Sequence, residues 1–173
     1  MSRYQTRRRI GKMKARRKKT YFERVPGTPE PVVVEIKRRV RFNEADPMAI
    51  FWHGRYPLLF EEASEELGRR CGLTYKAFYE AGLRVPVVEV HIDYYQPLFL
   101  GEEFTIRGSF IWHEGARINI EYHIIKMDGS LATSGYTVQL FTDHQSGKPY
   151  MISPELLDQC RKRWIAGEFH YHQ

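Results

Sequence analysis

The sequence predicts an α+β fold, in which an antiparallel β-sheet of about five strands wraps around one long central helix. A strand-like run comes first, a segment with helical apolar spacing follows, and strand-like runs make up most of the remainder. Short turn-forming sequences join the later runs, and short connections favour antiparallel neighbours. A single long helix beside such a sheet must bury its apolar face against it, which favours the wrapped arrangement.

The first strand and the long helix are predicted in the first half of the chain. VVVEIKRRVRF, residues 32–42, starts with β-branched residues and then alternates, as strands do. From Gly54 onward, apolar residues recur every three or four positions and predict a helix of about 15 to 19 residues, ending near Cys71-Gly72. Pro57 falls in the first turn, where its missing N–H is not required. The apolar face consists of Tyr56, Leu59, Phe60, Ala63 and Leu67.

The later elements are marked by turn and cap signals. Thr74 can cap a short helix over residues 75–82. Asp128-Gly129 is a strong hairpin signal between two of the expected strands. Ser153 is expected to cap a last helix over residues 154–166, with Pro154 at its first position. The strands are expected over residues 85–98, 103–114, 117–127 and 131–143.

The composition is that of a folded protein with one main domain. The chain has 173 residues, of which 42% are hydrophobic and 14% aromatic. No apolar run approaches the roughly 20 residues of a membrane-spanning helix, and the N-terminus lacks the apolar part of a secretory signal. We therefore expect no transmembrane segment and a cytoplasmic location. Cys71 and Cys160 lack a paired metal-binding spacing, so we expect two free thiols in a reducing compartment.

The positive charge is concentrated at the N-terminus. The net charge is +6, but residues 1–20 contain ten Lys or Arg and no acid, which leaves −4 for the rest of the chain. Like charges and few apolar residues predict a tail that is largely disordered by itself. We divide the chain into a basic tail and linker (1–30), a folded domain (31–152) and a C-terminal helix and tail (153–173), with the first boundary at VPGTPEP.

Three interpretations of the basic tail remain open. It can be a solubilising arm, or it can recruit an acidic partner such as nucleic acid, an anionic membrane or an acyl carrier protein. It can also be an organelle presequence, which its Arg content permits and its scarcity of Ser weakens.

The most informative motif is FNEADPMAIFWHG, residues 42–54. Asp46 stands in an Asp-Pro turn, and His53 follows seven residues later at the predicted start of the long helix. The first N–H groups of a helix are unpaired and carry partial positive charge, so they can stabilise an oxyanion. By itself, however, an Asp before Pro is also a common turn device, and a His at this place is a common helix-start residue.

Two stretches together resemble a known family. RFNEADPMAIFWHGRYPLLFEEASEE and VEVHIDYYQPLFLGEEFTIRG are similar to the signature of the 4-hydroxybenzoyl-CoA thioesterase-type hot-dog family, and the resemblance covers roughly residues 33–145. It implies a hot-dog fold and a homodimer or homotetramer with active sites at subunit interfaces. It also implies hydrolysis of acyl thioesters of CoA or an acyl carrier protein, without a metal or redox cofactor.

The resemblance also assigns roles to residues. It implies that Asp46 is the nucleophile or general base and that His53 is the second catalytic residue. It places Gly54, Tyr56, Glu61 and Met48 in the substrate-binding site, with the amide of His53 or Gly54 in the oxyanion hole. The family usually has Gly in the turn after the Asp, whereas this chain has Met48-Ala49. Gly permits a positive φ there, and Met48 can narrow the site or change acyl preference.

Two other functions are compatible with these patterns. One is a non-catalytic hot-dog dimer that binds nucleic acid or another polyanion through its basic tail. The other is a hot-dog dehydratase, which is less well supported because the signature is of the thioesterase kind. His91, His113 and His123 lie on separate predicted strands without ligand-like pairing, and we expect no metal site there.

Overall fold

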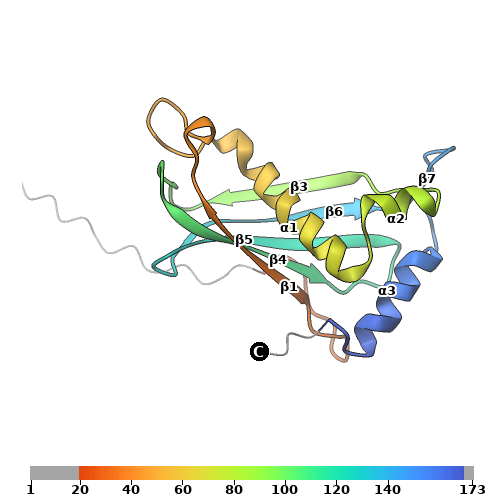
Figure 1. The fold of residues 1–173 in the computed structure, drawn as a ribbon. Coiled ribbons are helices and arrows are strands. Elements are labelled where there is room, and N and C mark those ends of the chain that lie inside the picture. The colour runs from red at the N-terminus through yellow and green to blue at the C-terminus, as the bar shows by residue number, and fades with distance from the viewer. Residues whose placement is uncertain (1–19, 170–173) are drawn as a thin grey trace, which may run out of the picture.

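The computed structural model describes residues 20–169 and confirms the predicted α+β architecture (Figure 1). Expectations for residues 1–19 and 170–173 lie outside the described residues. The elements in chain order are β1 (Val32–Arg39), η1 (Phe42–Glu44), η2 (His53–Arg55), α1 (Tyr56–Cys71), α2 (Tyr75–Glu80), β2 (Leu83–Arg84), β3 (Val87–Tyr94), β4 (Glu103–Ile111), β5 (Arg117–Lys126), β6 (Leu131–Leu140), β7 (Thr142–Asp143) and α3 (Glu155–Ile165). Five strands form one antiparallel sheet in the order β1-β4-β5-β6-β3.

The long helix α1 buries its apolar face against the sheet, as its spacing predicts. Phe60 and Ala63 are at most 2% exposed. The Phe60 ring stacks on Tyr122 of β5, with ring centroids 4.2 Å apart and planes 5° from parallel. Gly108 of β4 allows the close approach of the helix, since a Cβ at this position would lie 2.9 Å from the Ala63 Cβ. The central position of the helix is therefore fixed by side-chain volume on both surfaces.

The ends of α1 follow local sequence signals. Gly72 is its C-cap with φ 77, a left-handed conformation that glycine adopts without strain. At the other end the helix begins at Tyr56, with Pro57 in its first turn, and the 3₁₀ turn η2 precedes it. None of the helices in residues 20–169 is both long and apolar enough to cross a membrane.

Four of the predicted strands, 32–42, 85–98, 103–114 and 131–143, end three or four residues too late, and for the first two the cause lies elsewhere in the chain. The first strand ends at Arg39 instead of residue 42, because the chain turns into η1, where the buried Glu44 pairs with Arg38. The strand predicted over residues 85–98 ends at Tyr94. After it, the N–H groups of Tyr95 and Gln96 both bond the Ala132 carbonyl at 2.9 and 3.1 Å, which ends the ladder before Pro97.

One predicted helix cap is confirmed and the other is wrong. Thr74 Oγ1 accepts a hydrogen bond from the Ala77 N–H at 3.2 Å, as expected for the cap of α2. Ser153 does not cap α3, because its hydroxyl donates to the Asp158 side chain instead. Pro154 is the N-cap residue and not the first helical residue, since its ψ of 156° is extended.

Helix α3 closes one end of the sheet. Its Trp164 packs on Phe110, with ring centroids 4.7 Å apart, and donates from Nε1 to the Glu30 carbonyl at 2.7 Å. The two cysteines are free thiols, as predicted, and both are buried. They lie against each other where α3 meets the end of α1, and the hydrogen bond to Cys160 together with burial raises the pKa of Cys71.

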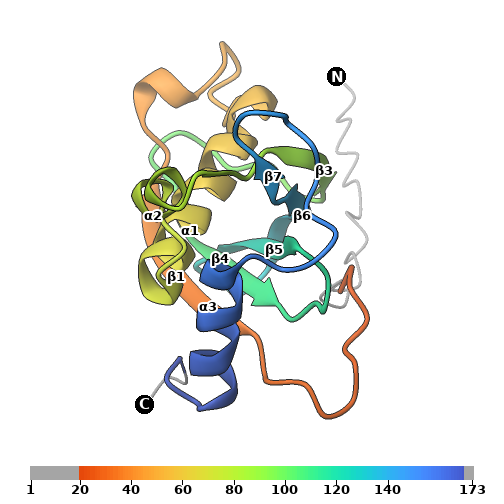
Figure 2. The ribbon, with the colours of Figure 1, turned by 90° about the vertical axis from the view of Figure 1, so that its right-hand side faces the viewer.

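The described chain that precedes β1 begins beside the sheet face opposite α1 and then loops round to β1 (Figure 2). The N–H groups of Tyr21 and Phe22 both donate to Glu121 Oε1, at 2.6 and 2.9 Å. The Tyr21 hydroxyl donates to Asp93 Oδ2 at 2.8 Å. Part of the segment assigned to the tail and linker thus packs on the domain, and any truncation must stop before Tyr21.

Candidate active site

The loop that contains Asp46 is a tight hairpin. The Asp46 N–H bonds the Ile50 carbonyl at 2.8 Å, and the Ala49 N–H bonds the Asp46 carbonyl at 2.9 Å. The half-buried Asp46 carboxylate contributes to the turn through Oδ1, which accepts from Met48 N at 2.8 Å and from Ile50 N at 3.1 Å. Its second oxygen, Oδ2, accepts no hydrogen bond from the described residues. The turn therefore orients the carboxylate and leaves one oxygen for chemistry.

The turn also forces one residue into an unfavourable backbone conformation. Ala49 has φ 60°, and among the described residues it is the one non-glycine residue with a positive φ. Such a conformation brings Cβ close to backbone atoms, at a cost of roughly 1 to 2 kcal/mol. The departure from the family pattern thus falls at a position where the backbone itself favours glycine.

A partly buried ion cluster attaches this loop to the rest of the fold. Arg38, near the end of β1, donates from Nη2 to Glu44 Oε1 at 2.5 Å and from Nη1 to Glu62 of α1. Glu44 Oε2 accepts in addition from the Arg41 N–H at 2.9 Å, and the Glu44 carbonyl accepts from Trp52 N at 2.9 Å. One arginine therefore holds β1, the residues on both sides of the Asp46 loop, and α1 in fixed relation.

The Asp46 loop has a second anchor in the connection between β3 and β4. The Phe51 N–H bonds the Leu98 carbonyl at 2.8 Å, and the Leu100 N–H bonds the Ala49 carbonyl at 2.9 Å. Leu98 is fully buried, which fixes this connection to the core. Two segments about 50 residues apart in sequence thus form one surface beside Asp46.

At the start of the helix, the N–H groups of His53 and Gly54 bond no acceptor in the described part of the chain, and we call these two residues the helix mouth. The first bond of η2 runs from Arg55 N to the Trp52 carbonyl at 2.9 Å, so the N–H groups of His53 and Gly54 precede the helical pattern. The His53 side chain is exposed. Its carbonyl accepts from the Tyr94 hydroxyl at 3.2 Å, which ties the mouth to β3.

Trp52 lies directly over the helix mouth. A Cβ at Gly54 would meet the Trp52 ring at 2.7 Å, so glycine is required there by close contact with the indole. The Trp52 and His53 rings are neighbours, with centroids 5.5 Å apart. Any ligand that reaches these amides passes an aromatic side chain that is 47% exposed.

Two further residues that the resemblance places in the binding site lie away from the surface of the mouth. Tyr56 is 2% exposed and packs edge-on against Phe51 and Tyr94, with ring centroids 5.0 Å away in each case. It supports the mouth from below. Glu61 lies further along α1 and accepts from the Tyr75 hydroxyl, which joins α1 to α2. Within one chain, the structure brings Asp46 and Met48 together in one turn and His53 and Gly54 together in another.

The comparison with known families covers these features. The model of the thioesterase-like superfamily matches residues 40–160, a range that includes the Asp46 loop, the helix mouth, all of α1 and four strands of the sheet. The chain belongs to the thioesterase-like superfamily. This family is broader than the 4-hydroxybenzoyl-CoA thioesterase type that the motifs resemble.

Named members of the superfamily share moderate identity with this chain. The "Putative acyl-CoA thioesterase YneP" of Bacillus subtilis is 29% identical over 110 residues, 64% of this chain and 80% of that protein. The 1,4-dihydroxy-2-naphthoyl-CoA hydrolase of Crocosphaera subtropica is 29% identical over 88 residues, 50% of this chain and 64% of that protein. The DHNA-CoA thioesterase structure from Staphylococcus aureus has a TM-score of 0.65 at 24% identity, covers 79% of this chain and 88% of its own, and confirms the hot-dog fold.

Several exposed apolar side chains surround the helix mouth, and we call them the apolar rim. The sequence analysis identified only Met48 among them. Its members come from the Asp46 loop, the end of β3 and the loop before β4: Met48 (73% exposed), Trp52 (47%), Tyr94 (51%), Phe99 (49%) and Leu100 (42%). Apolar groups gathered on a surface in this way mark a site for a ligand or a partner. The run YYQPLFL could have indicated these residues, because it contains more apolar residues than a surface loop at the edge of a sheet usually has.

The strain at Ala49 gives a prediction about stability. Replacing Ala49 by Gly removes the Cβ conflict at positive φ, and we expect the free energy of unfolding to rise by about 1 kcal/mol. Urea denaturation at unchanged m-value measures this difference. Ala45→Gly is the matched control, because Ala45 has φ −92 and should lose about 0.5 to 1 kcal/mol. Equal destabilisation by both variants would show that the Ala49 backbone is not strained.

Proposed function

We propose that this protein is an acyl-CoA thioester hydrolase in which Asp46 and the helix mouth act on the same carbonyl group. The observation that carries the proposal is the state of the Asp46 carboxylate: two N–H groups hold Oδ1, and Oδ2 accepts no hydrogen bond from residues 20–169. A purely structural turn Asp needs only the first of these oxygens. The family supports the reaction class, and the relatives named above act on CoA thioesters.

The proposed chemistry divides the work between side chain and backbone. The N–H groups of His53 and Gly54 bind the oxygen on which negative charge develops, and one such donor typically contributes roughly 3 to 4 kcal/mol to the transition state. Asp46 then acts by one of two routes. As nucleophile it forms a mixed anhydride and expels the thiolate, and water cleaves the anhydride; as general base it takes a proton from the attacking water. Both routes yield a free acid and a thiol.

The other proposed site residues have supporting roles. We assign the His53 side chain to the thioester carbonyl or the thiolate leaving group, which its exposure allows. Met48, 73% exposed beside Asp46, would contact the acyl group or its carrier. Tyr56 supports the mouth from within the core, and Glu61 would bound the acyl site from α1. CoA is the preferred carrier because the relatives' names specify it, and acyl carrier protein is the alternative.

We also propose that the active unit is a homodimer, from which a homotetramer would be built. Strand β3 pairs with β6 on one side, and no described strand pairs with its other side. Its side chains are unusually apolar for an edge, with Val88 54% and Val90 49% exposed. A second copy paired along β3 would cover them, and it would lie close to the mouth because Tyr94 of β3 bonds the His53 carbonyl.

Substitution of Asp46 tests the proposed function. We expect Asp46→Asn to lower acyl-CoA turnover by roughly 10²- to 10⁴-fold, since Asn keeps the turn bonds but neither attacks nor accepts a proton. Thiol release from short, medium, long and aromatic acyl-CoAs measures it. Asp128→Asn is the matched control, because Asp128 also accepts a turn N–H, from Ser130 at 2.9 Å, in an exposed hairpin. Unchanged turnover in a folded Asp46→Asn protein would refute the mechanism.

A charged substitution on β3, the strand proposed to pair with a second copy, tests the dimer. Val90→Lys places an ammonium group on β3, where pairing with a second strand would bury it, so we expect a monomer with little or no turnover. Sedimentation velocity and the thiol-release assay are run together. Val25→Lys, at a residue 58% exposed outside the sheet, should keep both assembly and activity. A fully active monomer would show that the site is complete in one chain.

The alternative function is a hot-dog scaffold that holds nucleic acid or another polyanion through the basic tail. Ten cationic residues in residues 1–20 favour it. Deleting residues 1–19 separates the two functions, and this truncation keeps the contacts of Tyr21 and Phe22 with Glu121. We expect turnover of free acyl-CoA to survive, and any RNA binding by the full chain to be lost and to weaken steeply with salt. A full chain that binds RNA but turns over no acyl-CoA, and that loses the RNA when residues 1–19 are deleted, would favour the scaffold.

A further inference from the structure

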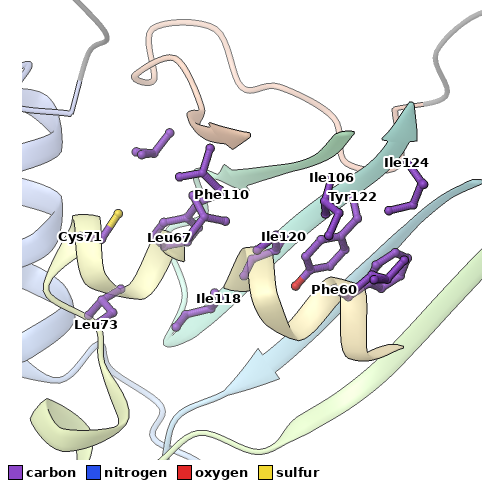
Figure 3. Close-up of a cluster of buried hydrophobic side chains, with 14 of the residues drawn as sticks. Phe60, Leu67, Cys71, Leu73, Ile106, Phe110, Ile118, Ile120, Tyr122 and Ile124 are labelled. Atoms are coloured by element: carbon purple, nitrogen blue, oxygen red, sulfur yellow. The ribbon is translucent and has the colours of Figure 1, made fainter. Parts of the chain in front are cut away.

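A cavity separate from the helix mouth lies under the second half of α1. Its volume is about 270 Å³, and it lies between α1, α2 and the helix-facing side of the sheet, with exposed residues of both helices at its open side. Its walls are formed by Leu67, Leu73, Phe78, Phe110, Ile118 and Ile120. Most of these residues are labelled in Figure 3, where they surround the region between Cys71 and the Phe60–Tyr122 pair.

Packing closes the cavity off from the proposed catalytic end. The helix residues that line it begin at Ser64, about 16 Å along the axis from His53 at 1.5 Å per residue. Between the two, Phe60 stacks on Tyr122 and presses on β6, where a Cβ at Gly135 would meet the Phe60 ring at 2.8 Å. A small acyl group held at the mouth therefore does not extend into this cavity within one chain.

Gln139 is the one buried polar residue among those that line the cavity. The other polar lining residues are half-buried or exposed: Ser64, Glu65, Arg69, Thr74, Tyr75 and Lys76. Gln139 of β6 pairs in register with Ile118 of β5, which places both side chains on the side of the sheet that faces α1. Gln139 is 9% exposed and lines the cavity, and its side-chain amide forms no hydrogen bond with the described residues. Nearly all polar groups in protein interiors form a hydrogen bond, and the Gln139 amide is placed to form one with a molecule in the cavity.

Thr137, the next residue of β6 that faces α1, has the hydrogen-bond partner that a buried polar group usually has. Thr137 is 6% exposed, and its hydroxyl lies 3.0 Å from the Tyr122 hydroxyl in a buried hydrogen bond. The fold thus satisfies the polar group next to the Phe60 wall and leaves unsatisfied the one that faces the cavity. A ligand group can supply the missing partner.

We propose that this cavity binds a ring-sized apolar molecule with one hydroxyl or carbonyl oxygen, and that the oxygen pairs with the Gln139 amide. The charged residues that line the cavity, Glu65, Arg69 and Lys76, have exposed side chains, whereas its buried walls are aromatic and branched and favour an apolar ring. The amide both donates and accepts, so it recognises either kind of oxygen. This site is independent of the proposed thioesterase chemistry.

The full chain is titrated with two matched probes, 2-indanol and indane, which differ by one hydroxyl group. We expect both to bind with one site per chain and 2-indanol to bind about tenfold more tightly, the worth of one hydrogen bond. Backbone amide NMR shifts should be confined to Phe78, Ile118 and their neighbours. Shifts centred on Trp52 and His53, or no saturable binding of either probe, would overturn the proposal.

Substitution of the amide identifies the group responsible. Gln139→Leu keeps a side chain of similar size but removes the amide. We expect this variant to bind 2-indanol more weakly than the unsubstituted protein does, so that its affinities for the two probes become equal. Gln145→Leu, at an exposed glutamine, should leave the tenfold preference unchanged. A preference retained in Gln139→Leu would show that Gln139 does not recognise the oxygen. Probe binding is measured without a thioester, so a failure to bind the probes leaves the hydrolase proposal unaffected. Likewise, the turnover of Asp46→Asn does not bear on the proposal for the cavity.

Discussion

The partly buried pairing of Arg38 with Glu44 and Glu62 is the constraint on which the candidate active site depends. Burial by itself would lower the pKa of Arg38, but its bonds to Glu62 and Glu44 outweigh burial and raise it, so the cation persists. Buried ion pairs contribute little net stability, because desolvation offsets their attraction. What this cluster provides is geometry: it joins β1, the start of the Asp46 loop and α1 at one point. The strained Ala49 turn is tolerated on a loop held this firmly.

The sequence predicts those parts of the fold that depend on local chemistry. The C-cap at Gly72 and the cap at Thr74 are set by residues within one turn, and both are confirmed. The strand predicted to continue past Tyr94 and the cap assigned to Ser153 are wrong, because distant groups decide them. Ala132 takes the N–H groups after Tyr94, and Asp158 takes the Ser153 hydroxyl. Neither competitor is visible in the local pattern.

The candidate site likewise has residues that the local sequence indicates and residues that only distant contacts bring to it. Asp46, His53 and the substitution of glycine at Ala49 are contained in one contiguous motif, so a sequence resemblance could indicate them. Tyr94 and the apolar residues Phe99 and Leu100 reach the mouth only because β3 and the loop after it fold against the Asp46 hairpin. Their role depends on a contact between segments about 50 residues apart, which residue spacing does not encode.

The residues of β5 and β6 that face α1 differ in polarity, and this difference bears on where the fold can bind ligands. The inward residues of β5 are Ile118, Ile120, Tyr122 and Ile124, which form a core that α1 covers. The inward residues of β6 are Thr133, Gly135, Thr137 and Gln139, small or polar at every position. Such a row stabilises the helix less than an apolar one would. The close contact at Gly135 and the bond at Thr137 have a structural explanation. The Gln139 side chain forms no hydrogen bond within the described chain, and the molecule proposed to bind in the cavity would supply one.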